Sequence, residues 1–370
     1  MTKREVNLRI FEGKEVPYVL FQPRLAPWYN WNKERGKLPP KYAQMSFPEL
    51  YKELDISMRY PFEHGAPWPL ERRFSSAVKV KEEEEGETKK IIFETPYGEL
   101  VEKWGKTTGG GGWRLMEHAV KNKEDLKRLR WLFQNTTFHF LPSNFEKGEE
   151  FQGDLGEPQF WLPRSPYQTL SLEWMGLENL IYSLVDAHQE VEDVMKAIDE
   201  AYDSLYEELI SYGRIKIINF GENIDAQLLS PAYFEQYLIP FYEKRSNQLR
   251  KHGIYTHIHI DGSFKPILKF LKDLPFDGLE ALTPLPQGDV SIEEMKEHIG
   301  DKILLDGIPA VLFLSTYPEE ELMACVEKLV KLFHPRLVLG ISDELPQAAG
   351  EESLERIRKI SAYCKNWKNP

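Results

Sequence analysis

The feature that most constrains the fold is a regular alternation of short apolar runs with longer helical segments, from residue 123 to the end of the chain. Apolar runs of this kind between helices are typical of parallel strands that are covered on both faces. The predicted strands are 160–162, 215–220, 254–260, 279–282, 303–305 and 337–341, and the predicted helices are 123–133, 176–211, 231–252, 263–274, 291–299, 317–333 and 351–367. Another apolar run at 17–21 brings the strand count close to eight. The pattern predicts a (β/α)8 TIM barrel, with an open doubly wound sheet as the alternative.

The first third of the chain has a different texture. Residues 1–15 and 46–59 have helical patterns, and Ser46 is a suitable N-cap for the second of these helices. Residues 77–104 alternate in the manner of an antiparallel β-meander, with turns at Glu85-Gly86 and Pro96-Tyr97-Gly98. We therefore expect residues 1–370 to form a single barrel domain with an N-terminal extension, in which a helical and β-meander segment is inserted at about 46–115.

Four consecutive glycines at Gly109–Gly112 raise the question of a phosphate-binding loop. The motif lacks a following Lys-Ser/Thr pair, and no apolar strand precedes it. The sequence therefore favours a flexible or closely packed loop over a phosphate cradle.

Charge and composition exclude several classes of function. The formal net charge is −12, which disfavours binding to nucleic acids and to anionic membranes, because both require a positive surface. No apolar run is long enough to cross a membrane, and the first residues do not form an apolar signal region, so we expect a cytoplasmic protein. Only two cysteines occur, Cys325 and Cys364, and their spacing predicts neither a disulfide nor a thiolate metal site.

Polar and charged side chains stand where the predicted strands end. In (β/α)8 barrels the active site is built at these carboxyl ends, so such residues are expected to share one rim. They are Arg24, Arg164, Glu222, His257, His259, Asp261, Glu280, Thr283, Asp306 and Asp343. The segment Tyr255 to Gly262 alternates strictly, which puts His257, His259 and Asp261 on one face of a strand. The set favours an enzyme or a small-ligand protein over a scaffold.

Each of these residues also has a structural interpretation. Glu222 and Asp306 are suited to capping the helices that follow them, or to pairing with Arg24 or Arg164. The aromatic residues after the first strand, which include Trp28 and Tyr29, are suited equally to the core and to the walls of a pocket.

Several motifs in their order resemble the uroporphyrinogen decarboxylase superfamily, and within it the corrinoid-dependent methyltransferases. They are Gly221-Glu222-Asn223, Leu229-Ser230-Pro231, His259-Ile260-Asp261-Gly262 and Gly278-Leu279-Glu280-Ala281-Leu282-Thr283-Pro284. The match covers roughly residues 160 to 365. The resemblance implies a (β/α)8 barrel whose mouth admits a tetrapyrrole or a corrinoid protein.

Two departures from the family patterns bear on the reaction. The decarboxylases carry an arginine-rich motif after the first strand, whereas only Arg24 stands in that place here. Thiol-methylating members hold zinc with an H-x-C motif and a second cysteine near the last strand, whereas this chain has His259-x-Asp261 and Ser342-Asp343. A zinc ion without thiolate ligands is a harder Lewis acid, which suits an oxygen leaving group better than a thiol.

We therefore predict a methyltransferase that moves a methyl group from a small donor, such as an aryl methyl ether, an alcohol or an amine, to the cob(I)alamin of a corrinoid protein. The alternatives are a uroporphyrinogen-type decarboxylase and a non-catalytic protein that binds a tetrapyrrole or a corrinoid. The predicted partners are the corrinoid protein, which brings the cobalamin, and the methyl donor, and a homodimer is left open. The predicted roles are catalysis for Glu222, His257 and Asp306, substrate binding for Arg24, Trp28, Tyr29 and Arg164, and zinc binding for His259, Asp261, Asp343 and Glu222.

Overall fold

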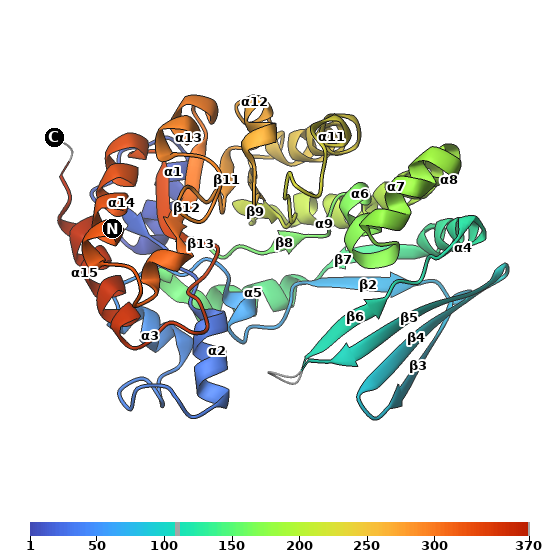
Figure 1. Cartoon of the computed structure of the whole chain (residues 1–370), viewed down its shortest axis with the longest axis horizontal. Helices are drawn as coiled ribbons and strands as arrows, with labels where there is room; N and C mark the ends of the chain where they lie inside the picture. Colours follow the sequence, from blue (N-terminus) through green and yellow to red (C-terminus); the bar gives the residue numbers. More distant parts are fainter. Residues whose placement is uncertain (108–111, 369–370) are drawn as a thin grey trace. The chain divides into compact units, whose positions relative to one another are not determined.

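The computed structural model describes residues 1–107 and 112–368, and it divides into two compact units (Figure 1). The first unit comprises Met1–Pro69, Pro142–Leu162 and Arg214–Pro370, and the second comprises Leu70–Leu141 and Pro163–Gly213. Of the predicted glycine loop, Gly109, Gly110 and Gly111 lie outside the described residues. The expectation of one barrel domain over residues 1–370 stays a prediction.

The first unit is built on a seven-stranded sheet in the order β1-β13-β12-β11-β10-β9-β8, in which all paired strands are parallel. The strands are β1 (Leu20–Phe21), β8 (Trp161–Leu162), β9 (Ile217–Phe220), β10 (Tyr255–His259), β11 (Gly278–Glu280), β12 (Ile303–Pro309) and β13 (Leu337–Ser342). Each lies within or next to a predicted apolar run, so the expectation of a parallel α/β sheet is confirmed. The closure of the sheet into an eight-stranded barrel stays a prediction.

Helices alternate with these strands, as the sequence predicted. They are α1 (Lys3–Phe11), α2 (Ala26–Glu34), α3 (Phe47–Glu53), α5 (Pro142–Gln152), α10 (Pro231–Tyr233), α11 (Ile239–Arg250), α12 (Leu268–Leu271), α13 (Ile292–His298), α14 (Glu319–Phe333) and α15 (Glu352–Asn366). Capping boxes begin three of them, because Thr2, Ser46 and Ser291 each bond reciprocally with the glutamate three residues later.

Helix α1 covers the amino ends of the strands. Its residues Val6, Ile10 and Phe11 are buried against the first residues of several strands, among them Ile217 and Ile303. This apolar packing forms a core at the end of the sheet opposite to the predicted active site.

The predicted helix over 46–59 is wrong in its second half. Helix α3 ends at Glu53, and Asp55 has a positive φ of 53°, which a helix cannot contain. The chain beyond it is not helical and is buried: Ser57 N–H donates to Phe21 O at 2.8 Å, and Met58 N–H donates to Leu155 O at 2.9 Å. Arg59 O accepts from Gln159 N–H at 3.1 Å. Residues Ser57–Arg59 thus bond to β1 at one edge of the sheet and, at the other edge, to residues that precede β8. We call Ser57–Arg59 the bridging segment.

The second unit contains two antiparallel sheets. One pairs β2 (Leu70–Phe74) with β7 (Thr136–Phe140), and the other joins β3 (Lys79–Glu85), β4 (Thr88–Thr95), β5 (Gly98–Lys106) and β6 (Trp113–Glu117) in chain order. Its helices are α4 (Lys123–Gln134), α6 (Pro166–Thr169), α7 (Leu177–Asp186), α8 (His188–Ala201) and α9 (Asp203–Tyr212). The predicted single helix over 176–211 is three helices, because Ala187 leaves the helical conformation and Tyr202 ends α8. Among the described residues, no helix is both long enough and apolar enough to cross a membrane.

Candidate functional site

Charged and amide side chains converge at the carboxyl ends of the central strands of the first unit. The parallel register places His257 beside Asn219, and His259 beside Glu280. Asp306 lies in β12, and Asp343 directly follows β13. The strands themselves therefore bring these residues together, and we call the group the strand-end cluster.

Glu280 is the centre of the cluster and is fully buried. Its Oε1 accepts from Arg59 Nη1 at 2.6 Å and from Tyr60 Oη at 2.7 Å, and its Oε2 accepts from Asn219 Nδ2. Burial alone would raise the pKa of Glu280, but the Arg59 guanidinium and the nearby His257 outweigh burial and hold that pKa well below its usual range. Glu280 is therefore ionised, and it is satisfied by donors.

Arg59 joins Glu280 to a second buried carboxylate. Its two terminal nitrogens donate to Asp306 at 3.1 and 2.9 Å, and its Nε donates to Gln22 Oε1 at 2.9 Å. Burial raises the pKa of Asp306 to about 7, although the charge of Arg59 opposes this rise. Gly340 in β13 leaves room for this carboxylate, because a Cβ atom there would collide with Asp306 Oδ1. The Arg59 guanidinium thus pairs with two buried carboxyl groups, those of Glu280 and Asp306.

The two histidines of β10 have opposite electrostatic surroundings. His257 is fully buried, and burial lowers its pKa, so the neutral imidazole is favoured. His259 is 8% exposed; burial alone would lower its pKa, but Glu280 and Asp343 raise it to about 9. Its Nδ1 lies 3.7 Å from Glu280 Oε2, and its Nε2 lies 3.8 Å from Asp343 Oδ2. His259 is therefore a cation at neutral pH, next to the partly exposed rim.

Arg24 holds the acids at the rim. It donates to Glu63 Oε1 at 2.7 Å and to Asp343, and Glu344 Oε2 lies 3.7 Å from its Nη2. Burial raises the pKa of Glu344 to about 7, against the charge of Arg24. The guanidinium also lies 5.5 Å from the centre of the Tyr60 ring.

Asp261 lies outside the strand that was predicted to carry it. Strand β10 ends at His259, so the expectation that Asp261 continues the alternating face of the strand is wrong. Burial raises the pKa of Asp261, and His259 opposes this effect. Its Oδ1 is buried and makes no hydrogen bond within the described part of the chain. The charges of His259 and Asp343 nevertheless shift the pKa of this carboxylate, so it lies near the cluster.

The other predicted site residues are placed differently. Glu222 follows β9 and is 1% exposed. Arg164 belongs to the second unit, where it donates to Glu173 at 3.0 Å. Trp28 and Tyr29 are buried in α2, and their polar atoms donate to backbone oxygens at 2.8 and 2.5 Å. The substrate-binding and catalytic roles of these four residues stay predictions.

The described residues contain no group of three or more His, Cys, Asp or Glu side chains positioned to hold one metal ion. The imidazole of His259 and the carboxylates around it are suitable donor types for zinc, but Asp343 is bonded to Arg24, and Glu280 to Arg59. In this arrangement the side chains do not fit a zinc ion.

Sequence reasoning missed Arg59, Tyr60 and Asn219 as members of the cluster. Arg59 is the last residue of the bridging segment, and Tyr60 follows it. The helical periodicity of the sequence had assigned the bridging segment to the preceding helix. A signal was available, because Ile56-Ser57-Met58-Arg59-Tyr60 runs into Pro61, and a residue before proline disfavours the helical conformation.

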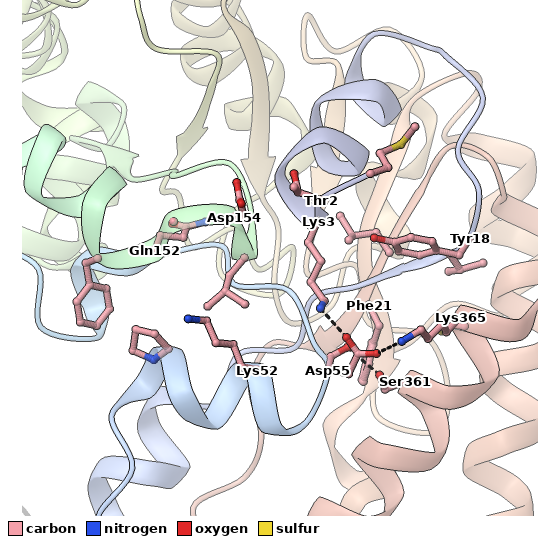
Figure 2. Close-up of a pocket in the computed structure, with 18 of the residues that line it drawn as sticks. Thr2, Lys3, Tyr18, Phe21, Lys52, Asp55, Gln152, Asp154, Ser361 and Lys365 are labelled. Carbon is pink, nitrogen blue, oxygen red and sulfur yellow. Dashed lines mark hydrogen bonds and ion pairs between the residues drawn. The ribbon is translucent and has the colours of Figure 1, made fainter.

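The opposite end of the sheet has a cavity of a different character (Figure 2). The cavity has a volume of about 530 Å3 and is lined by residues around the start of β1, the end of α3, the residues before β8 and α15. In its wall, Asp55 accepts from Lys3 at 2.6 Å and from Lys365 at 2.7 Å (Figure 2). These are partly exposed ion pairs, in contrast to the buried ones of the strand-end cluster.

Comparison with known families gives one match. The family model of uroporphyrinogen decarboxylase (URO-D) matches residues 166–360, which is more than half of the chain. The chain belongs to the uroporphyrinogen decarboxylase family. The resemblance inferred from the strand-end motifs is thereby confirmed. No curated protein matches the sequence.

One solved structure shares the fold, and a second has a weaker similarity. A methyltransferase from Methanosarcina mazei is similar over 98% of both chains, with a TM-score of 0.61 and 15% sequence identity. A B12-independent methionine synthase from a Shewanella species covers 89% of each chain, with a TM-score of 0.46 and 12% identity. At such identities the likeness concerns the fold, so chemistry has to be argued from the side chains of this family member.

Proposed function

We propose that the protein is a methyltransferase that takes a methyl group from a small donor and passes it to the cob(I)alamin of a corrinoid protein. The observation that carries this proposal is the pairing of both cluster arginines with carboxylates of the chain itself. Arg59 lies between Glu280 and Asp306, and Arg24 between Glu63 and Asp343. The fold shared with a methyltransferase supports the proposal.

This charge balance argues against a polyanionic substrate. Two guanidinium groups and the His259 imidazolium face the carboxylates of Glu63, Glu280, Asp306, Asp343 and Glu344. A porphyrinogen with its many carboxylates would have to break these pairs, and leaving a buried charge unpaired costs several kcal/mol, on the order of 3–5. A neutral or cationic donor, such as a methyl ether, an alcohol or an amine, meets no such cost.

His259 is the group best placed to act on the donor. Its Nδ1 lies 3.7 Å from Glu280 Oε2, and its Nε2 lies 3.8 Å from Asp343 Oδ2, whose side chain is 35% exposed. A protonated imidazole held in this way can give a proton to the oxygen or nitrogen that loses the methyl group. When bound, the corrinoid supplies the low-valent cobalt that accepts the methyl group.

We also infer that the parallel sheet closes into the predicted (β/α)8 barrel. The bridging segment supports this, because it bonds to Phe21 on one side and to Leu155 and Gln159 on the other. Closure through this segment explains how Arg59 enters the interior at the level of Glu280 and Asp306.

The proposal is tested by mixing the protein with chemically reduced cobalamin and a panel of aryl methyl ethers, methanol and methylamines. We expect the cob(I)alamin absorbance to convert to that of methylcobalamin with at least one donor. His259→Ala should slow the conversion by at least about 100-fold, the loss typical of a missing general acid. His252→Ala, which changes an exposed histidine, is the matched control and should leave the rate unchanged. No conversion with any donor, or release of carbon dioxide from uroporphyrinogen, contradicts the proposal.

A further inference from the structure

Two buried amides connect helix α1 to the strand-end cluster. Asn7 lies on α1 and Gln159 lies just before β8, and both side chains are fully buried. The other buried residues of α1, Val6, Ile10 and Phe11, are apolar and pack under the sheet. Asn7 is thus the exception in a helix that otherwise contributes only hydrophobic contacts to the interior.

The direction of each hydrogen bond along this connection is fixed by a backbone group. The N–H of Glu157 is necessarily a donor, and it points at Asn7 Oδ1 at 3.3 Å, so this atom of Asn7 is the oxygen. Gln159 Nε2 donates to the same oxygen at 3.3 Å. The remaining amide atom of Gln159, Oε1, therefore faces His257 Nε2 at 2.8 Å.

An amide oxygen accepts and cannot donate, so His257 Nε2 has to carry a hydrogen. The ring is thereby held with its other nitrogen, Nδ1, 3.2 Å from Glu280 Oε2. His259 Nδ1 approaches the same oxygen at 3.7 Å. Hydrogen bonds therefore run from Asn7 through Gln159 to Nε2 of His257, whereas Nδ1 lies beside Glu280 Oε2 without a hydrogen-bond partner among the described residues.

We propose that Asn7 and Gln159 are positioning residues of the active site, which keep a hydrogen on Nε2 of His257 and fix the orientation of its ring beside Glu280. Their catalytic consequence rests on the proposed function, but the tautomer assignment does not. Outer partners of this kind set tautomer and ring orientation in many histidine sites. Through Asn7 and Gln159, helix α1 thus reaches the strand-end cluster from the opposite ends of the strands.

The direct test is a two-bond 1H–15N spectrum of the protein labelled with 15N-histidine, with the His257 signals assigned by their loss in His257→Gln. We expect the pattern of an Nε2–H imidazole in the wild-type protein. Gln159→Leu removes the acceptor, and Asn7→Leu frees the Gln159 amide to rotate. Both variants should show a mixture of tautomers.

A purely structural role predicts a different outcome. Ser246→Ala is the matched control, because Ser246 is also fully buried and bonds at 2.8 Å to Thr256 of the same strand β10. It should lower thermal stability without changing the His257 signals. An Nδ1–H pattern in the wild-type protein, or an unchanged His257 pattern in folded Gln159→Leu, overturns the proposal.

Kinetics then separate this proposal from the proposed function. In the cob(I)alamin assay we expect Gln159→Leu to lower kcat by on the order of tenfold, with KM for the methyl donor unchanged. Ser246→Ala should leave kcat unchanged. If no turnover is found even in the wild-type protein, the proposed function fails, while the spectrum alone still decides the tautomer.

Discussion

The two ends of the β-strands in the first unit are both buried, but they are buried in opposite ways. At the amino ends, Val6, Ile10 and Phe11 of α1 pack against aliphatic residues of the sheet. At the carboxyl ends, Arg59, Glu280 and Asp306 are fully buried charges. The apolar end gains stability from every group removed from water, whereas the charged end is stable only as long as each group keeps its partner. Function at one end thus depends on pairing, and stability at the other depends on packing.

The largest effect is expected from breaking the pairing at the charged end. Arg59→Met leaves Glu280 and Asp306 buried without their shared cation, so the free energy of unfolding should fall by about 3–5 kcal/mol. Methyl transfer should be lost as well, because Glu280 orients His259. Urea unfolding and the cob(I)alamin assay measure the two losses. Arg35→Met, a cation that stacks on Trp31 away from this cluster, is the control, and an equal loss in both variants would contradict the contrast.

A smaller effect, of a different kind, is expected at the apolar end. Ile10→Ala removes buried methyl and methylene groups and should lower the free energy of unfolding by about 2–4 kcal/mol. Because the cavity formed lies among aliphatic side chains, kcat of the folded protein should stay within about twofold of the wild-type value. A loss of kcat in Ile10→Ala without a loss of stability would contradict the contrast between packing at the amino ends and catalysis at the carboxyl ends of the strands.

The pH dependence gives a third contrast, within β10 itself. The pKa of His259 is raised from 6.5 to about 9, whereas burial lowers that of His257. A raised pKa means that the contribution of protonated His259 to stability is complete below pH 6.5 and is lost as the pH rises through about 9. NMR titration of the metal-free protein should show His259 titrating near pH 9 and His257 remaining neutral at pH 7. A His259 midpoint near 6.5 would contradict the charge arrangement of the cluster.

The smallest effect is expected at the exposed ion pairs of the cavity in Figure 2. The side chains of Asp55 and Lys365 are 44% and 66% exposed, so water and salt screen their attraction. Asp55→Asn should lower the free energy of unfolding by less than about 1 kcal/mol. Thermal melting at low and at high salt checks this, and a loss as large as that of Arg59→Met would refute the distinction between exposed and buried pairs.

The sequence predicted the parallel strands and the residues that end them, because both follow from local patterns. A strand fixes which of its side chains share a face, so the alternation of residues alone places His257 and His259 together. Asp261 could not be placed, because the strand ends at His259, before Asp261, and periodicity does not mark that end.

The partners of the cluster were not predictable in the same way. Arg59 lies 221 residues from Glu280 along the chain, and its contact depends on an extended segment that has no strand periodicity of its own. Likewise, nothing in the sequence around Asn7 distinguishes it from a polar residue on a helix surface. Its burial follows from how α1 lies against the sheet, which is a tertiary contact rather than a local preference.

Methyl transfer at the strand-end cluster, with His259 taking part in the step, is tested by isotope labelling. The donor found in the panel is labelled with 13C in its methyl group, and the label is followed by NMR in the presence of cob(I)alamin. We expect the wild-type protein to move the label to cobalt-bound methyl, and His259→Ala to move about one hundredth as much or less in the same time. A label that stays on the donor with the wild-type protein, or equal transfer by both proteins, would contradict this expectation.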